Sequence, residues 1–453
     1  MNRFLMWLVR VITSTFFRRI DVVAAEKVPS EGPVIFAGNH PNALMDGWLL
    51  TAKCGRTPLH FMVNAKLWEF PILGRMLTKS GAVPVYRREE HGDSADNTSA
   101  FEKTYEVLEN GHCMGIFPEG VSHAESQLTK LKTGTARIAL EVAARGKAVV
   151  TIVPCGLNYI HRHRFRSQVL IEFGEPIVVD ETWVEQYRED EQAAVLKLTE
   201  HLAAAIAGVT LNAPDWNTLR FAQTARRLYK PSGTMLTPAQ YVELNRRFIA
   251  EYLKAPDDPE NAAFRRGAEE YQARLDMLGL KDHQLRQPVS LTKVFRKITL
   301  RSLWMLILLP LSVPGALLHL PIGWIAAVVG ERFSYEMDDI ATLKVFATIM
   351  LLPLLYLIIG IVIGVYFGPW WAIGVIAGLL LSFYSSVQLM EAQTSLFVSI
   401  LSLLRLARLR SEVDALREQR AELVETIRDM TDRRAPEDLD RMFTREDFGK
   451  TQE

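Results

Sequence analysis

Residues 33–46 read PVIFAGNHPNALMD, and this stretch sets the fold that we expect for the N-terminal part of the chain. The apolar run 33–37 predicts a short buried strand that enters Gly38. Pro41 suits the first turn of a helix, where its missing N–H costs nothing. A strand that leads directly into a helix is the repeating unit of α/β domains, which place their functional sites where such strands end.

The same alternation of short apolar runs and helical stretches continues from Val22 to about Thr210. We therefore predict an α/β domain at 21–210, with a mixed sheet flanked by helices. Further strands are predicted at 82–86, 114–117, 148–154 and 169–173, and helices between them, for example at 97–109 and 132–145.

His40 and Asp46 are the candidate catalytic residues of this strand–helix junction. The carboxylate of Asp46 can bind one nitrogen of the imidazole and leave the other free to act as a general base. Such a base would activate an alcohol for attack on an acyl carbonyl group. A histidine and an aspartate six positions apart are weak support by themselves, because a histidine with a structural role is more common.

Other strand ends carry residues that suit a site for a phosphorylated substrate. The stretch 81–87, GAVPVYR, ends in Arg87, whose guanidinium can bind two phosphate oxygens. The stretch 117–120, FPEG, places a carboxylate and a conformationally permissive glycine at the next strand end. Pro154 ends a fourth strand. Each residue could belong to an ordinary turn, but four such strand ends in this order favour a site.

These four blocks resemble the motifs of the membrane glycerolipid acyltransferases, the family that acylates glycerol 3-phosphate and lysophosphatidate. The resemblance covers about residues 20–180, and 132–134 (KTG) and 173–177 (FGEPI) look like the family's connecting segments. Residues 225–231, ARRLYKP, are similar to a segment of the branch that acylates glycerol 3-phosphate or dihydroxyacetone phosphate.

The resemblance implies the glycerolipid acyltransferase fold and a direct acyl transfer, with His40 as the base and Asp46 as its partner. It assigns substrate binding to residues at the strand ends, with Pro154 shaping the acyl-donor pocket. These residues are Gly81, Arg87, Phe117, Pro118, Glu119, Gly120, Lys132 and Pro154. No metal or other cofactor is expected, and acyl-coenzyme A or acyl carrier protein serves as co-substrate.

The spacing of the catalytic pair departs from the family pattern. Five residues separate His40 from Asp46, where the family usually has four. One extra residue on a straight helix rotates the later position by about 100°. The turn at Pro41-Asn42 must therefore absorb this rotation if the two side chains are to meet.

The residues after FPEG depart from the pattern as well. The family usually has Thr-Arg-Ser there, whereas this chain has VSH at 121–123. The missing arginine would have contacted the substrate phosphate. We expect Lys130, Lys132 or Arg137 to replace that contact.

The charge balance and the cysteines exclude several classes of protein. The chain has 453 residues, with 52 basic and 52 acidic side chains and a formal net charge of zero. A nucleic-acid-binding protein normally carries a basic excess, so no nucleic-acid partner is expected. Cys54, Cys113 and Cys155 are too far apart in sequence for a local metal cluster, and three cysteines do not suggest a disulfide framework.

Residues 1–20 predict an amphipathic helix that lies on the membrane surface. Arg10 interrupts its apolar run, which argues against a signal peptide or a spanning helix. The alternative is a helix that packs on the next domain. Residues 211–290 are predicted to be a charged helical extension.

Residues 291–392 predict a transmembrane region. The stretch 345–390 has no charged residue and is broken at 367–369, which gives spans at 345–366 and 370–390. The stretch 303–329 contains three prolines and either spans with kinks or is re-entrant.

Basic residues flank this region on both sides, at 293–301 and 405–410, which favours an even number of crossings and a re-entrant 303–329. We therefore expect a multi-pass membrane protein with its catalytic domain on the cytoplasmic face. The remaining segment, 393–453, predicts a charged helical tail, and a homo-oligomer through this helix is one expected partnership.

Three functions remain open from the sequence. The leading prediction is acylation of glycerol 3-phosphate, or of dihydroxyacetone phosphate, in phospholipid synthesis. The second is acylation of 1-acylglycerol 3-phosphate or another lysophospholipid. The third, from a different class, is a membrane scaffold that keeps the acyltransferase fold without activity. The expected partners are membrane lipids, the acyl thioester and a glycerol-phosphate acceptor.

Overall fold

The computed structural model describes residues 3–69, 71–86, 97–231, 233–285, 291–334, 339–408, 410–434 and 442–443. The chain forms two compact units, which are described separately here. The first consists of Met1–Trp216, Leu236–Arg246 and Ser334–Thr342. The second consists of Asn217–Met235, Arg247–Phe333 and Leu343–Glu453.

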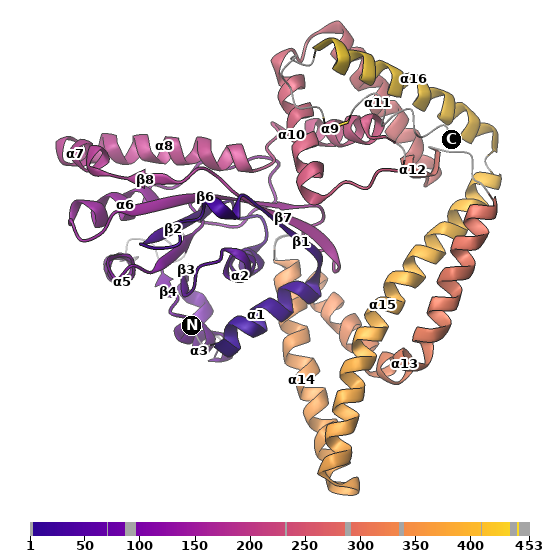
Figure 1. Cartoon of the computed structure of the whole chain (residues 1–453), viewed down its shortest axis with the longest axis horizontal. Helices are drawn as coiled ribbons and strands as arrows, with labels where there is room; N and C mark the ends of the chain where they lie inside the picture. Colours follow the sequence, from indigo (N-terminus) through magenta and orange to yellow (C-terminus); the bar gives the residue numbers. More distant parts are fainter. Residues whose placement is uncertain are drawn as a thin grey trace. The chain divides into compact units, whose positions relative to one another are not determined.

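The first unit is built on a mixed sheet of eight described strands (Figure 1). The strand order is β1-β7-β6-β2-β5-β3-β4, and β8 pairs with β6. Pairing is antiparallel between β6 and β7 and between β6 and β8, and parallel elsewhere. This confirms the predicted α/β domain with a mixed sheet. The strands are β1 (Phe17–Val23), β2 (Val34–Gly38), β3 (Leu59–Asn64), β4 (Val83–Val85), β5 (Cys113–Ile116), β6 (Val150–Tyr159), β7 (Ser167–Phe173) and β8 (Ile177–Val179).

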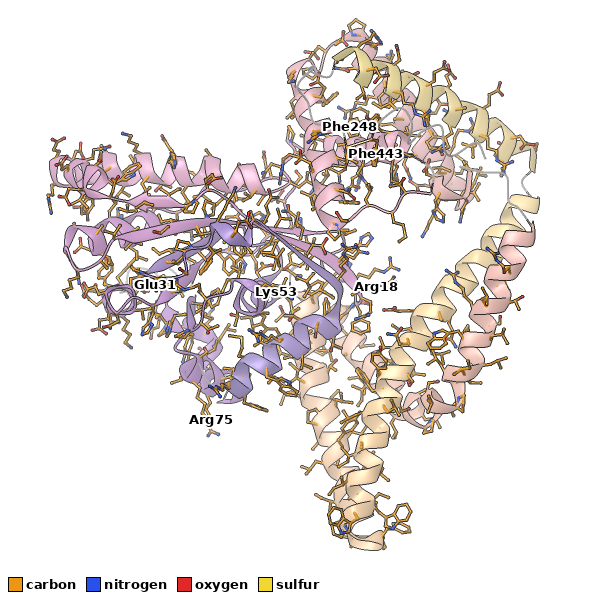
Figure 2. All side chains as sticks on the ribbon, in the orientation of Figure 1. Arg18, Glu31, Lys53, Arg75, Phe248 and Phe443 are labelled. Atoms are coloured by element: carbon orange, nitrogen blue, oxygen red, sulfur yellow. The ribbon has the colours of Figure 1, made fainter. Side chains whose placement is uncertain are left out.

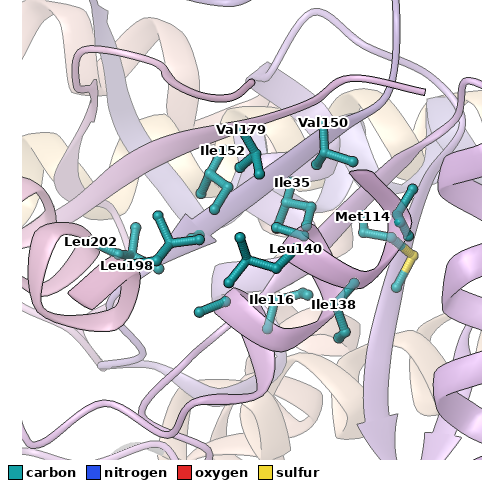
Figure 3. Packing of buried hydrophobic residues seen from close by; sticks show 14 of the residues in the cluster. Ile35, Met114, Ile116, Ile138, Leu140, Val150, Ile152, Val179, Leu198 and Leu202 are labelled. Carbon is teal, nitrogen blue, oxygen red and sulfur yellow. The ribbon is translucent and has the colours of Figure 1, made fainter. Parts of the chain in front are cut away.

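The core of this unit is an apolar cluster between the sheet and the helices α6 (Gly134–Ala144) and α8 (Glu191–Val209). Ile35 of β2 and Met114 of β5 pack there with residues of both helices, such as Ile138 and Leu198 (Figure 3). Every residue of β2 and of β5 is buried. A strand that is covered on both faces has a continuous apolar sequence, which is why the sequence revealed these two strands.

The N-terminal helix is shorter than predicted. Helix α1 (Arg3–Phe16) ends where β1 begins, so the prediction of a helix through residue 20 was wrong for 17–20. Phe17 is buried, and β1 pairs in parallel with β7. These ladder hydrogen bonds, made with a strand about 150 residues later, override the local helical pattern.

One face of α1 packs against α2 (Ala43–Lys53), and another face does not pack. Val9 and Phe16 are buried on the packed side. Phe4 and Trp7 are 64% and 57% exposed, and they lie three positions apart on the helix. The helix therefore contacts its own domain and also keeps an exposed aromatic surface.

The other described helices of the first unit are α3 (Pro71–Ser80), α5 (Thr98–Glu109) and α7 (Glu181–Glu189). Aspartates cap the last two helices of the domain. The side chain of Asp180 accepts hydrogen bonds from the first turn of α7, and Asp190 does so for α8. Such caps stabilise the free N–H groups of a helix start.

The second unit is helical. Three of its helices are long and apolar enough to cross a membrane, at Ile298–Arg332, Ile340–Phe367 and Pro369–Gln393. In Figure 2 the side chains along α14 are almost entirely carbon. The helices are α9 (Trp216–Tyr229), α11 (Pro259–Leu278), α12 (Asp282–Leu285), α13 (Leu291–Arg332), α14 (Ile340–Phe367), α15 (Pro369–Arg408) and α16 (Arg410–Arg434). Helix α10 (Pro238–Lys254) is divided between the two units, and the first residues of α9 and α14 belong to the first unit.

The proline-rich middle of α13 is bound to α15. Pro314 removes one helical hydrogen bond and disturbs its neighbours. The N–H of Gly315 donates to Oγ of Ser382 at 2.8 Å, and this hydroxyl donates to the carbonyl of Ser312 at 3.2 Å. Backbone groups inside a bilayer need such partners, so α15 supplies those that the break in α13 requires.

The C-terminal helix α16 packs within its own unit. Its apolar side chains Val413, Leu416, Leu423 and Ile427 form a stripe along the helix and are buried. The helix contacts α11 and α12, and Arg420 donates to the carboxylate of Asp282 at 2.9 Å. The apolar stripe therefore packs within its own unit.

Candidate active site

His40 and Asp46 meet at the carboxyl end of β2. Nδ1 of His40 lies 2.9 Å from Oδ2 of Asp46. The side chain of Asp46 is fully buried, while that of His40 is 16% exposed. Nε2 of His40 has no hydrogen-bond partner in the described part of the chain. The pair thus has one imidazole nitrogen fixed and the other available at the edge of the site.

The turn between the two residues absorbs the extra position. Helix α2 begins at Ala43. The sequence predicts its first turn at Pro41, two residues earlier. Ala43 has φ +41°, in the left-handed region that side chains rarely adopt. The N–H of Asn42 then donates to Oδ2 of Asp46 at 2.7 Å. This strained turn rotates the first helical turn so that Asp46 faces His40.

The aromatic ring of Phe117 stacks on the imidazole of His40. The ring centroids are 4.1 Å apart, and the planes differ by 5°. Phe117 in turn stacks on Phe61 of β3, with centroids 6.1 Å apart. Phe117 therefore fixes the plane of the imidazole, a role that does not require contact with a substrate.

Glu119 is used entirely by contacts within the protein. Its side chain is fully buried. Oε1 accepts the N–H of His40 at 2.8 Å, and Oε2 accepts the N–H and the hydroxyl of Thr129 at 2.9 and 2.8 Å. Oε2 also bonds Nε2 of His123. Burial raises the pKa of Glu119, but these hydrogen bonds outweigh it, so that the net pKa is lowered.

His123 forms a second histidine–carboxylate pair with Glu119. The bond to Glu119 raises the pKa of His123 against the opposing effect of burial. Nδ1 of His123 accepts the N–H of Glu125 at 3.2 Å, and its backbone N–H donates to the carbonyl of His40 at 3.1 Å. Both backbone hydrogen-bonding groups of His40 are therefore bound by the segment 119–123.

Three predicted substrate-binding residues have clear packing roles. Gly81 has φ +74°, and a Cβ there would lie 2.4 Å from Nδ1 of His60. Gly120 has φ +79°, and a Cβ there would lie 2.6 Å from Cε of Lys132. Pro118 is buried, and its carbonyl accepts the N–H of Lys132 at 2.7 Å. These contacts explain why glycine and a compact turn are needed here.

The remaining predicted residues differ in where they lie. Lys132 is exposed, and its side chain lies over Gly120. Pro154 is buried within β6, opposite Ala37 of β2. Arg87 lies outside the described residues. Among the residues that are described, no cluster of three or more histidine, cysteine, aspartate or glutamate side chains could hold a metal ion.

Tyr159 is a site residue that the sequence analysis missed. Its hydroxyl donates to Oδ1 of Asp46, and burial, together with this carboxylate, raises the pKa of Tyr159 well above its ordinary value. The predicted strand 148–154 ended too early, because Gly156 and Asn158 interrupt the apolar run. The strand β6 continues to Tyr159 since Asn158 is itself hydrogen-bonded to Val209 and Leu211.

Two family models match the chain. The acyltransferase model matches residues 19–158, which include the whole of β2, β5 and the His40–Asp46 pair. The model of the glycerol-3-phosphate acyltransferase 2 C-terminal domain matches residues 221–439, which include the apolar helices. The two matches do not overlap.

Individual relatives agree with these matches. Glycerol-3-phosphate O-acyltransferase 2 of Saccharomyces cerevisiae is 37% identical over 59% of this chain and 38% of its own length. Glycerol-3-phosphate O-acyltransferase 1 of the same yeast is 32% identical over 64% of this chain and 40% of its own length. An uncharacterised acyltransferase of Schizosaccharomyces pombe is 25% identical over 97% of this chain and 82% of its own length.

The chain spans about two fifths of the length of the two Saccharomyces relatives. The two family models together match both the sheet domain and the helical region. In both regions the chain is therefore similar to glycerolipid acyltransferases, and in particular to glycerol-3-phosphate O-acyltransferases.

Proposed function

We propose that the protein transfers a fatty acyl group from acyl-coenzyme A or acyl carrier protein to a hydroxyl of glycerol 3-phosphate. The observation that carries the proposal is the His40–Asp46 pair, with Nδ1 bound to a buried carboxylate and Nε2 left unbonded by the described residues. The two Saccharomyces relatives, named for glycerol 3-phosphate, support this choice of acceptor.

In the proposed reaction, Nε2 of His40 takes the proton of the acceptor hydroxyl while the oxygen attacks the thioester carbonyl carbon. The C–S bond then breaks, and the departing thiolate takes that proton from the imidazolium. The products are an ester and a free thiol. Asp46 keeps the proton of the neutral imidazole on Nδ1 and stabilises the imidazolium that forms.

The acceptor phosphate requires cations near this edge of the sheet. Lys132 supports this role because its side chain is exposed and lies over Gly120, the residue that follows Glu119. Arg87 is the second proposed ligand, since its guanidinium can bind two phosphate oxygens. Glu119 has both oxygens occupied by protein donors, so we do not give it a substrate contact.

The three apolar helices support a membrane protein whose product enters the lipid phase. The basic residues that precede this region, such as Arg296 and Arg301, support a catalytic unit on the cytoplasmic face. The exposed side chains of Phe4 and Trp7 on α1 would lie in the membrane interface.

The test is to incubate the purified full-length protein with labelled acyl-coenzyme A and a panel of acceptors, and to identify the lipid product. We expect 1-acylglycerol 3-phosphate from glycerol 3-phosphate, and none with the His40→Ala variant. A product only from lysophosphatidate, or only from dihydroxyacetone phosphate, would change the acceptor. The assay is repeated with the acyl carrier protein thioester as donor. If neither donor gives a product with any acceptor, the protein is an inactive scaffold and the proposal is refuted.

A further inference from the structure

Tyr159 touches the catalytic pair from a distant part of the sequence. It ends β6, 113 positions after Asp46, and its hydroxyl donates to Oδ1 of that carboxylate. Asp46 therefore has three donors, since Oδ2 accepts from Nδ1 of His40 and from the N–H of Asn42. Tyr159 is the described partner of Oδ1.

The third donor has a geometric consequence for Asp46. The bonds to His40 and Asn42 both end on Oδ2, so they restrain the carboxylate through one oxygen only. The bond from Tyr159 restrains it through Oδ1 as well, so that the plane of the group is held at both oxygens. The side chain of Asp46 is fully buried, so water is poorly placed to replace the tyrosine hydroxyl.

Tyr159 is itself held firmly. Its backbone pairs with Val169 in the antiparallel ladder between β6 and β7, and its ring contacts that of Phe17 at a centroid distance of 5.7 Å. Burial and the negative charge of Asp46 raise its pKa, so the hydroxyl keeps its proton and remains a donor. A rigid strand thus presents a permanent donor to the carboxylate.

The residues after Tyr159 bind the same elements. The carbonyl of Arg162 accepts the side-chain amide of Asn42 at 3.1 Å, and its guanidinium donates to the carbonyl of His123 at 3.2 Å. Arg162 thus joins the end of β6 to the turn of His40 and to the segment of His123.

We propose that Tyr159 is a positioning residue of the acyl transfer reaction, which acts on His40 only through Asp46. Its hydroxyl holds the carboxylate in the plane that keeps the imidazole proton on Nδ1 and directs Nε2 toward the acceptor. This inference rests on the proposed function, because it concerns the same base. It adds a third residue, from β6, to a pair that the sequence motif places on β2 and α2.

The first experiment compares Tyr159→Phe with Tyr187→Phe in the full-length protein. Phenylalanine keeps the ring contact with Phe17 and removes only the hydroxyl. Tyr187 is a matched control, because its hydroxyl also donates to a carboxylate, Oε2 of Glu141, at 3.2 Å. We expect Tyr159→Phe to lower kcat about tenfold with both KM values within about twofold, and Tyr187→Phe to leave kcat unchanged.

The second experiment is a double-mutant cycle with Asp46→Asn. If Tyr159 acts through Asp46, Tyr159→Phe should change kcat by less than about twofold in the Asp46→Asn background. An equal loss in both backgrounds would mean that Tyr159 acts independently of Asp46 and would overturn the proposal. Melting temperatures of all four proteins show whether a variant is folded, and Tyr159→Phe keeps the proposal testable because it creates no cavity.

The outcomes separate this inference from the proposed function. Wild-type protein without transferase activity would refute the function itself. Active wild-type protein with an equally active Tyr159→Phe variant would refute only the positioning role. A rise in the KM of either substrate, with kcat kept, would make Tyr159 a substrate ligand and also overturn the inference.

Discussion

Two histidine–carboxylate pairs are joined in this protein, and they differ in one respect that matters for chemistry. In the pair of His40 and Asp46, the second imidazole nitrogen has no described partner. In the pair of His123 and Glu119, both imidazole nitrogens are occupied, by Glu119 and by the N–H of Glu125. A histidine beside a carboxylate is thus a candidate base only when its other nitrogen is free.

The two pairs also differ in what their carboxylates hold. Asp46 binds an imidazole, a tyrosine hydroxyl and one backbone N–H, and so it orients a side chain. Glu119 binds the backbone N–H of His40 and two groups of Thr129, and so it holds one loop against another. We therefore expect substitutions at the first pair to reduce catalysis and substitutions at the second to reduce stability.

Asp46→Asn should have the largest effect on catalysis after removal of His40 itself. The amide has no negative charge to stabilise the imidazolium, and its NH2 group must replace an oxygen that now accepts a hydrogen bond. We expect kcat to fall about 100-fold or more, with a smaller change in melting temperature than Glu119→Ala causes. An Asp46→Asn enzyme with kcat near that of wild type would remove the carboxylate from the mechanism.

Glu119→Ala should have the largest effect on stability. It leaves four donors without their acceptor in a buried site, and we expect a loss of about 3 kcal/mol in the free energy of unfolding. Glu102→Ala is a matched control, because this carboxylate pairs with Arg145 but is 52% exposed, and its removal should cost far less stability than Glu119→Ala. Denaturation followed by tryptophan fluorescence would measure both, and equal losses would contradict the account.

His123→Asn should change the pH dependence of stability. The pKa of His123 is raised from 6.5, so its stabilising contribution is complete below pH 6.5 and is lost as pH rises through the raised pKa. The pKa of Glu119 is lowered from 4.5, so its contribution is complete above pH 4.5 and is lost as pH falls through the lowered pKa.

The stability difference between wild type and His123→Asn should therefore be largest between pH 4.5 and 6.5, at about 1 kcal/mol, and should shrink above that range. Melting temperatures measured from pH 4 to pH 9 would test this. A difference that does not change with pH would show that the pair is held by packing and not by charge.

Substitutions in the turns that carry the two histidine–carboxylate pairs should have the smallest effects on stability and on kcat. Ala43 and Gly120 both have positive φ, at 41° and 79°. Glycine at position 43 relieves strain but loses chain entropy, so Ala43→Gly should change stability by less than about 1 kcal/mol. Ala43→Val should be more destabilising than Ala43→Gly, and it should also lower kcat, because it disturbs the placement of Asp46. If Val and Gly behave alike, the left-handed turn has no role.

The sequence predicted the centre of the fold and the contact between His40 and Asp46 because both leave local patterns. The buried strands β2 and β5 are continuous apolar runs, and the motif at 38–46 pairs His40 with Asp46. It did not predict β1, whose FRRIDVV sequence continues the helical pattern of α1. That strand forms only because β7 is available to pair with it.

The surroundings of the site could not be predicted in the same way. Tyr159 reaches Asp46 only because β6 extends beyond its apolar part, and this extension depends on Asn158 finding partners near Val209. The hydrogen bonds from Thr129 to the carboxylate of Glu119 depend on the conformation of a loop, and no local sequence pattern predicts that conformation. Contacts of this kind arise from tertiary structure. A sequence motif can identify a site residue such as Glu119, but it does not identify the distant residue that binds it.

The most direct test of the central claim is to compare kcat of His40→Ala and His123→Ala in one assay, with acyl-coenzyme A and glycerol 3-phosphate. We expect His40→Ala to lose about 10²–10⁴-fold with little change in melting temperature, because only a base is removed. His123→Ala should lower the melting temperature and retain far more activity. Two results would contradict the role of His40 as the base. One is a His40→Ala enzyme whose kcat is within a few-fold of that of wild type. The other is a His123→Ala enzyme that keeps the wild-type melting temperature but loses as much kcat as His40→Ala.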